Sequence, residues 1–289
     1  MKLKHLSTAI ILATLPATGV FAAALDRSGQ SISAFLQPGN YFEAGISVLD
    51  PDVSGTTIAG LGSQKTGDMA GDYTFYNAAL KLQLTDKVSF GFIYDQPFGA
   101  DAEYKQTVGF TNAASNTEVE VDTQNITMLF GFQPNKYFNV YAGPAYQTVK
   151  GNVHLAGAAY GPLGAAIPLL GYTGYDANIK ETSGLGWLAG AAYQIPEIAL
   201  KASVTYRSEI DHDVIMKEKV PSAAVMAMAP KESTITTPQS VNLDLQSGIM
   251  ADTVAFANIR WVNWKDFAIK PEKFGIVTTS AAAPNGLNL

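Results

Sequence analysis

The sequence contains no cysteine, few histidines and little charge. The absence of cysteine from all 289 residues excludes disulfides as a source of stability. Charged residues make up 15% of the chain, whereas an ordinary soluble domain has roughly 25%. The formal net charge of -6 and the lack of basic clusters argue against nucleic acid as a partner.

The signatures of catalysis and of metal or cofactor binding are also missing. There are three histidines, and no Gly-x-Ser-x-Gly elbow, Walker loop or zinc-ligand spacing. We expect "DHD" at 211–213 to be a solvated loop and "DPDVSG" at 50–55 to be an Asx-type turn. The sequence therefore predicts a protein that is not an enzyme and that has no catalytic residue, no metal site and no cofactor.

The N-terminus has the composition of a Sec signal peptide. Lys2 and Lys4 precede an apolar stretch at 9–20, and small residues follow at 22–24. The apolar stretch is short for a membrane span, so an uncleaved anchor is the weaker alternative. We therefore assign residues 1–24 to export and exclude them from the fold.

Beyond this segment, apolar and polar residues alternate. In "FYNAALKLQL" (75–84) and "VNLDLQ" (241–246), every second residue is apolar and those between are mostly polar. Such alternation predicts strands with one apolar and one polar face. The predicted strands are 41–49, 73–84, 87–95, 118–132, 136–149, 180–194, 198–210, 236–249 and 253–264, with a tenth possible at 266–278.

The predicted strand 118–132 changes character along a single face. Glu118, Glu120 and Asp122 share that face with Met128 and Phe130. A strand that rises from hydrocarbon into water would show this change, whereas a secreted β-sandwich, the main alternative, gives no reason for it.

Connections between the strands alternate in length. Those at 85–87, 134–136, 195–197 and 250–252 are tight turns, while those at 50–72, 96–117, 150–179 and 211–235 are long. Short turns on one side and long loops on the other are typical of outer-membrane barrels. The sequence thus predicts an all-β fold, a transmembrane antiparallel β-barrel. The odd strand count and the polar end "AAAPNGLNL" indicate a barrel that is incomplete at its C-terminus.

The long connection after the strand 136–149 is unusually apolar. Residues 151–175 contain no acid, Lys or Arg, but they include six Gly and two Pro, which disfavour a spanning helix. An exposed apolar patch of this size usually marks a binding surface, and the Met-rich stretch 220–230 could extend it. Candidate capture residues on these loops are Leu155, Tyr160, Leu163, Ile167, Leu169, Leu170, Val225, Met226 and Met228.

Three stretches resemble one family of outer-membrane proteins. They are "YFEAGISVLDPDVSG" (41–55), "GLGWLAGAAYQIPEIALKASVTYRSEI" (184–210) and "NIRWVNWKDF" (258–267). In their order and spacing they are similar to the FadL-type long-chain fatty acid transporters (OMPP1/FadL/TodX-like). This resemblance implies a 14-stranded barrel, here partial over 41–289, whose interior holds an N-terminal hatch at 25–40.

The resemblance also implies two places where the barrel could open. The family usually carries Asn-Pro-Ala in its hatch, and this chain has Gln37-Pro38-Gly39 instead. A kinked third strand opens the family's barrel wall sideways, and Pro97 and Gly99 interrupt the alternation at the matching position. The start of an external loop is an equally good interpretation of 94–100.

The expected interior mixes apolar side chains with scattered cations, which suits an amphipathic carboxylate. Candidate interior ligands are Lys201, Arg207, Phe256, Arg260 and Lys270, although the cations could instead be solvated or paired with acids such as Asp244. The resemblance implies passive uptake of hydrophobic compounds, most of all long-chain fatty acids, by a monomer in the lipid of a Gram-negative outer membrane. Uptake of aromatic hydrocarbons and a structural or adhesive barrel are the alternatives.

Overall fold

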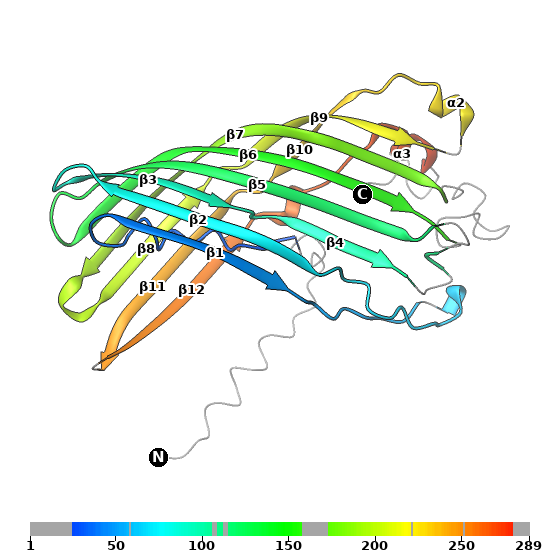
Figure 1. Ribbon diagram of the computed structural model, residues 1–289. Helices are drawn as coiled ribbons and strands as arrows, with labels where there is room; N and C mark the ends of the chain where they lie inside the picture. The colour runs from blue at the N-terminus through cyan, green and yellow to red at the C-terminus, as the bar shows by residue number, and fades with distance from the viewer. Residues whose placement is uncertain are drawn as a thin grey trace, which may run out of the picture.

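The computed structural model describes residues 25–57, 59–105, 109–111, 115–157, 173–220, 222–250 and 252–279. Its strands form one strongly curled antiparallel sheet, an open half-barrel whose two edges are β1 and β12 (Figure 1). Along the sheet the order is β1-β2-β3-β5-β6-β7-β8-β11-β12, with β4 on β5, and with β9 on β7 and β10. The strands are β1 (Tyr41–Leu49), β2 (Tyr73–Gln83), β3 (Val88–Asp95), β4 (Gly99–Tyr104), β5 (Thr117–Phe132), β6 (Phe138–Leu155), β7 (Tyr175–Ile195), β8 (Leu200–Arg207), β9 (Ile210–Lys219), β10 (Glu232–Thr237), β11 (Ser240–Met250) and β12 (Thr253–Val262).

Helical structure is confined to short pieces. These are η2 (Ala59–Leu61), α2 (Ala223–Met226), η3 (Pro196–Ile198), η4 (Trp264–Asp266) and α3 (Glu272–Val277). Among the described residues, none of these helices has the length and apolarity needed to cross a membrane.

Alternation along the strands divides the sheet into an outer and an inner face. On β5, Phe130 is 58% exposed on the outer face, whereas Asn125, Thr127 and Leu129 are buried on the inner face. Glu118 lies on the same outer face, nearer the other end of the strand. The expected change from polar to apolar along one face is therefore confirmed.

The sequence missed the strands β4, β9 and β10, and it misassigned the segments 211–213 and 266–278. The predicted strand 198–210 ends at Arg207 as β8. The following strand, β9, does not continue the pairing of β8 with β11 but pairs with residues 176–179 of β7. The "DHD" stretch expected to be a solvated loop belongs to β9, where His212 is fully buried. The possible tenth strand at 266–278 is wrong, because part of that segment forms η4 and α3.

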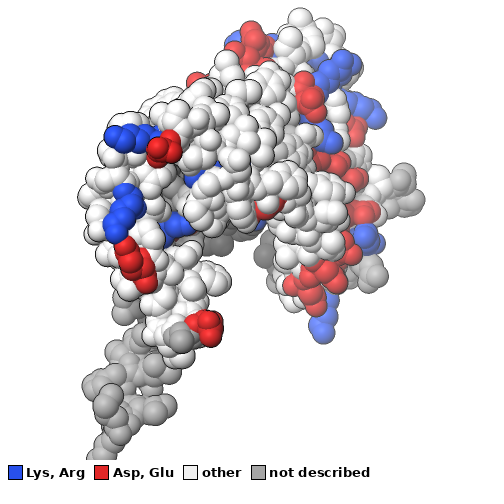
Figure 2. Space-filling model, turned by 60° about the vertical axis from the view of Figure 1, so that its left-hand side comes forward, with Lys and Arg blue, Asp and Glu red and all other residues white. Residues whose placement is uncertain are grey.

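The two ends of the sheet differ as the connection lengths predict. Short connections join β2 to β3, β5 to β6 and β7 to β8 at one end, which we call the turn end. Longer connections, α2, α3 and the β9–β10 hairpin gather at the other, which we call the loop end (Figure 1). Figure 2 shows charged side chains near these ends and a nearly uncharged surface between them.

Exposed aromatic side chains lie at two levels of this uncharged band. Tyr137 and Phe138 pack against Tyr193 near the turn end, and Trp187 packs against Tyr206 further up. Six residues separate Trp187 from Tyr193 on β7, which is roughly 20 Å along a strand. At a tilt near 40° this corresponds to a height of about 15 Å, so both groups fit within or at the border of the apolar band of about 25 Å that aromatic girdles flank in outer-membrane barrels.

Residues 25–40, which we call the inner segment, lie against the inner face of the sheet. Ile32, Phe35 and Leu36 are almost fully buried and pack against Leu129, Tyr141 and other inward side chains. Phe35 occupies a notch made by two glycines, because a Cβ at Gly91 would lie 2.4 Å from its ring. Gly131 on the neighbouring strand leaves room in the same way. Small residues in two strands thus create the seat for one aromatic anchor.

Phe35→Ala should loosen the inner segment, since emptying a buried aromatic site costs about 3 kcal/mol or more. The chain has no cysteine, so Ala34→Cys provides a single buried thiol whose maleimide labelling reports the loosening. We expect labelling to accelerate by about a hundredfold. Phe132→Ala, on the exposed outer face, is the control and should leave the rate unchanged. Equal rates in the two variants would contradict the anchoring role of Phe35.

Candidate functional site

The polar inner face of the sheet holds the inner segment by its backbone. Arg207 Nη2 donates a hydrogen bond to the Gln30 carbonyl at 2.8 Å, and Asn242 Nδ2 donates to the Gly29 carbonyl at 2.7 Å. Ser28 Oγ donates to Asp95 at 2.9 Å. The bonds from Arg207 and Asn242 satisfy two backbone carbonyls of the packed segment, which would destabilise it if they were left without partners.

Arg260 on the edge strand β12 joins several of these groups. Its Nε lies 2.7 Å from Asp26 Oδ2, and its Nη2 donates to Gln30 Oε1 at 3.0 Å. Its Nη1 donates to Asn242 Oδ1 at 2.7 Å. The guanidinium therefore links the start of the inner segment to β11 and β12 through several donors at once.

The barrel wall is interrupted between β3 and β4. Both strands pair with β5, but residues 96–98 between them leave the line of the ladder. The β2–β3 ladder ends at Ala78 and Tyr94, and Tyr76 N donates to the Gln96 side chain instead of to a strand. The wall closes again above this point through a bridge between Ala70 and Ala102. The result is a gap in the ladder, bounded by β2 on one side and β4 on the other.

The first residues of the inner segment close this gap from inside. Asp26 pairs with Phe98, Arg27 N donates to the Pro97 carbonyl, and Gly99 N donates to the Leu25 carbonyl, both at 2.8 Å. Residues 25–27 thus form a short antiparallel ladder with the interrupted part of the wall.

Arg27 passes through the wall at Gly99. Its Cζ lies 3.9 Å from the centre of the Tyr73 ring, and its Nη1 lies 3.3 Å from Oδ1 of Asp122 on the outer face of β5. Any Cβ at position 99 would lie 2.1 Å from the guanidinium, so this crossing requires glycine. The Arg27 side chain is 4% exposed, and Asp122 also pairs with Lys150.

An apolar pocket lies beside the gap. The rings of Phe98 and Trp264 meet edge to face with centroids 5.5 Å apart, and Phe267 packs on Trp264 in the same way. Ile179, Ile235 and Ile269 line the same pocket. Its free volume is about 20 Å³, little more than one water needs. A hydrophobic ligand could enter only if these side chains moved apart.

The loop end is capped by α2 and α3. Glu218 of β9 accepts hydrogen bonds from the first backbone N–H groups of α3, those of Lys273 and Phe274, and from Tyr175 Oη. Acceptors suit a helix N-terminus because its first N–H groups have no partner within the helix. Lys273 Nζ donates to the Met226 carbonyl, which ties α3 to α2.

The predicted capture residues fall into three groups. Leu155 is buried in the cap cluster with Tyr175 and Phe274, and Val225 packs against that cluster. Met226 and Met228 are exposed beside it. Tyr160, Leu163, Ile167, Leu169 and Leu170 lie outside the described residues.

The predicted interior residues are not brought together into one site. Lys201 and Arg207 of β8 and Arg260 of β12 all donate to the inner segment, at separate points along it. Phe256 is exposed on the edge strand, and Lys270 is exposed near β10, where its carbonyl accepts from Ser233. Gln37, Pro38 and Gly39 form the joint between the inner segment and β1, whereas Pro97 and Gly99 border the wall gap.

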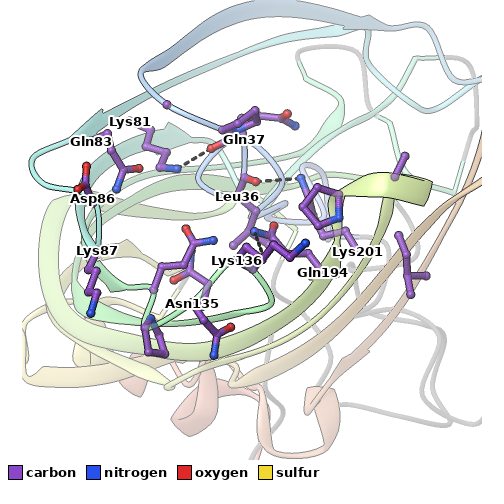
Figure 3. Close-up of a pocket in the computed structure, with 18 of the residues that line it drawn as sticks. Leu36, Gln37, Lys81, Gln83, Asp86, Lys87, Asn135, Lys136, Gln194 and Lys201 are labelled. Atoms are coloured by element: carbon purple, nitrogen blue, oxygen red, sulfur yellow. Dashed lines mark hydrogen bonds between the residues drawn. The ribbon is translucent and has the colours of Figure 1, made fainter.

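A larger cavity opens at the turn end (Figure 3). Its volume is about 770 Å³, and residues 36–39 of the inner segment form one of its sides. At its rim Lys136 pairs with Glu197, and this hydrogen bond raises the pKa of Lys136 and lowers the pKa of Glu197. Inside, Lys81 and Lys201 reach the inner segment from two sides (Figure 3).

Sequence reasoning missed several of these residues. Arg27, Asp122 and Lys81 belong to no motif, and they meet partners that lie far away in the chain. The strand alternation does place Lys81 on the opposite face from Leu80 and Leu82, so an inward lysine could have been found. Trp264 and Phe267 belong to the stretch 258–267 that carries the family resemblance, but the sequence alone did not place them in the apolar pocket.

Comparison with known proteins identifies the family. The model of a family described as "Outer membrane protein transport protein (OMPP1/FadL/TodX)" matches residues 24–281. The chain belongs to this family. A comparison with curated protein sequences gives no match.

Solved structures of FadL/TodX proteins share the fold. A Pseudomonas aeruginosa FadL homologue is 14% identical with a TM-score of 0.50, covering 78% of this chain and 59% of its own. The Ralstonia pickettii toluene transporter TbuX is 14% identical with a TM-score of 0.52, covering 89% and 71%. The P. putida toluene transporter TodX is 17% identical with a TM-score of 0.53, covering 81% and 64%. The chain thus spans about 59% of the FadL homologue's length, and the predicted all-β barrel class is confirmed.

Arg27→Met should free the start of the inner segment from the wall gap. The variant loses a charge-assisted contact worth more than about 1 kcal/mol. We therefore expect the backbone amides at positions 27 and 99 to exchange with deuterium about tenfold faster than in the parent. Mass spectrometry of the two peptides measures this. Lys150→Met removes the exposed cation from the same Asp122 and should change the exchange little. A similar acceleration in both variants, or none in either, would rule out the Arg27 contact as the one that holds the segment.

Proposed function

We propose that this protein is a monomeric outer-membrane channel for the passive uptake of hydrophobic compounds. The cap at the loop end collects the compound, the pocket beside Phe98 holds it, and the wall gap releases it sideways into the lipid. The observation that carries the proposal is the gap itself, which lies next to an apolar pocket and is closed by a separate segment. Sideways release spares an acyl chain a transfer through water that costs about 0.8 kcal/mol per CH₂.

In this proposal the inner segment acts as the hatch, and long-chain fatty acids are the first candidate substrate. Arg207 and Arg260 are held by the Gln30 carbonyl and the Asp26 carboxylate. A fatty acid carboxylate could replace these acceptors, because it offers guanidinium groups the same hydrogen bonds. Binding would then weaken the hold on residues 26–30 and favour opening of the gap.

Aromatic hydrocarbons are the second candidate. Phe98, Trp264 and Phe267 already pack edge to face, and a small aromatic ring could join them in this geometry without any cation. Two proteins with this fold are named as toluene transporters, although at this identity the likeness concerns the fold alone. A structural or adhesive barrel, the remaining alternative, would transport neither class.

Uptake by cells tests the proposal directly. A strain that lacks the full-length protein should take up labelled oleate more slowly than its parent, and a plasmid copy should restore the rate. The same three strains are compared with labelled toluene. Faster oleate uptake alone supports fatty acids, and faster toluene uptake alone supports aromatic hydrocarbons. Equal uptake of both compounds with and without the protein would contradict a transport function.

A disulfide across the gap should block transport reversibly. Asp26 and Phe98 face each other as a non-hydrogen-bonded antiparallel pair, for which Cα atoms lie about 4.5 Å apart, within disulfide range. We expect the Asp26→Cys, Phe98→Cys variant to lose uptake when oxidised and to regain it on reduction. The reduced form of the same protein is its own reference.

Each single-cysteine variant serves as the control, because it cannot form the crosslink and should not respond to the reductant. The native chain has no cysteine that could pair with the new thiols. If the crosslinked protein transports as fast as the reduced one, release does not pass through this gap, and the sideways route is wrong even when uptake itself is intact.

A further inference from the structure

The cavity at the turn end is separate from the apolar pocket, and the inner segment lies between them. The turn-end cavity is lined by three connections, those between β2 and β3, between β5 and β6 and between β7 and β8. Residues 36–39 of the inner segment complete the lining. Short turns face the periplasm in outer-membrane barrels. The cavity therefore opens toward the side of the membrane opposite the external cap.

Two lysines in this cavity have no acidic partner among the described residues. Lys81 is 3% exposed, and its Nζ donates to the Gln37 carbonyl at 2.5 Å. Lys201 Nζ donates to the Leu36 carbonyl at 2.9 Å. Neither lysine occurs in an ion pair of the described chain. An ammonium group has three N–H donors, so each has two left for another ligand.

The charges around the cavity are out of balance. Lys81 and Lys201 line the same cavity and donate to the adjacent Gln37 and Leu36 carbonyls, so two positive charges gather at one point of the inner segment. Among the described residues of the lining there is one carboxylate, that of Asp86, which belongs to the exposed turn beside Lys87. Lys136 has its own partner in Glu197. Buried charges are normally paired, because a desolvated cation without a counter-ion is costly.

We propose that this cavity binds an oxyanion, a carboxylate or phosphate group, between the ammonium groups of Lys81 and Lys201. The buried amide of Asn139 lines the same cavity and adds a neutral hydrogen-bonding group. The anion could be the head group of an acyl carboxylate whose stem lies along Leu36 and Leu200, or a free anion of the periplasm. Both sources present the same oxygen acceptors to the two lysines.

A bound anion should also strengthen the hold on the inner segment. The Leu36 and Gln37 carbonyls follow a helical turn in which Gln37 N donates to the Ala34 carbonyl. Carbonyls at the end of such a turn lack partners within it and favour cations. An anion that balances the two positive charges lets both lysines keep these bonds. The site would thus couple periplasmic anions to the stability of residues 32–37.

Calorimetric titration of the purified full-length protein in an uncharged detergent tests the site. The probes are inorganic phosphate, octanoate below its micellar concentration, and octanol as the uncharged analogue. We expect phosphate, octanoate or both to bind, and Lys81→Met and Lys201→Met each to weaken that binding by about tenfold, the loss expected for one charge-assisted hydrogen bond. Lys217→Met, on the exposed face of β9, is the matched control and should not change it.

The pattern of binding identifies the source of the anion. Binding of octanoate alone indicates an acyl carboxylate, binding of phosphate alone indicates a free anion, and binding of both indicates a general oxyanion site. If neither binds up to about 1 mM, or if both lysine variants bind like the parent, the proposal is wrong. It is also wrong if octanol binds as tightly as octanoate and is weakened by the same substitutions.

Variants that retain the positive charge distinguish a loss of the anion site from a loss of folding. Lys81→Arg and Lys201→Arg keep a cation and its donors, so they should bind the anion within about threefold of the parent. If they lose binding as fully as the methionine variants while remaining folded, a charge-based site is excluded. The inference does not depend on transport, since anion binding can persist in a protein that takes up neither oleate nor toluene.

Discussion

Hydrocarbon offers no hydrogen bonds to a peptide group, and this constraint shapes both faces of the sheet. The backbone must pair strand to strand, so successive side chains point alternately to lipid and to the interior. The outer face can then be apolar, as Phe130 on β5 illustrates, while the inner face is left to polar side chains. Those inner side chains in turn meet the backbone of the inner segment, and Arg207 and Asn242 bond to consecutive carbonyls.

Alternation of apolar and polar residues alone predicts most strands of the barrel wall, because each of these strands has an apolar outer face and a polar inner face. It fails for β9, which pairs with β7 and β10 at the loop end and faces other protein, so that His212 and Glu218 are buried there beside Val214. It fails again for α3, whose start is fixed by Glu218, a residue more than fifty positions earlier in the chain. In both cases tertiary contacts, rather than local period, decide the structure.

The candidate site could be predicted in kind but not in detail. An interior with scattered cations can be predicted from the strand faces, yet the Gln30 carbonyl that accepts from Arg207 lies 177 positions away, in the inner segment. Pro97 and Gly99 mark a break in the wall, but the sequence does not say that Arg27 fills it. Contacts between the inner segment and the sheet that holds it follow no repeat along the sequence, so neither the segment nor the strands reveal them.

The long strands β6 and β7 determine where the protein first meets its surroundings. The 21 residues of β7 extend for about 70 Å. At a tilt near 40° they rise about 50 Å, roughly twice the apolar height of an outer membrane. The cap formed by α2 and α3 therefore stands some two nanometres above the hydrocarbon, beyond the reach of the aromatic bands. In the proposed function, a molecule approaching from outside would touch this platform before it could dissolve in the lipid below.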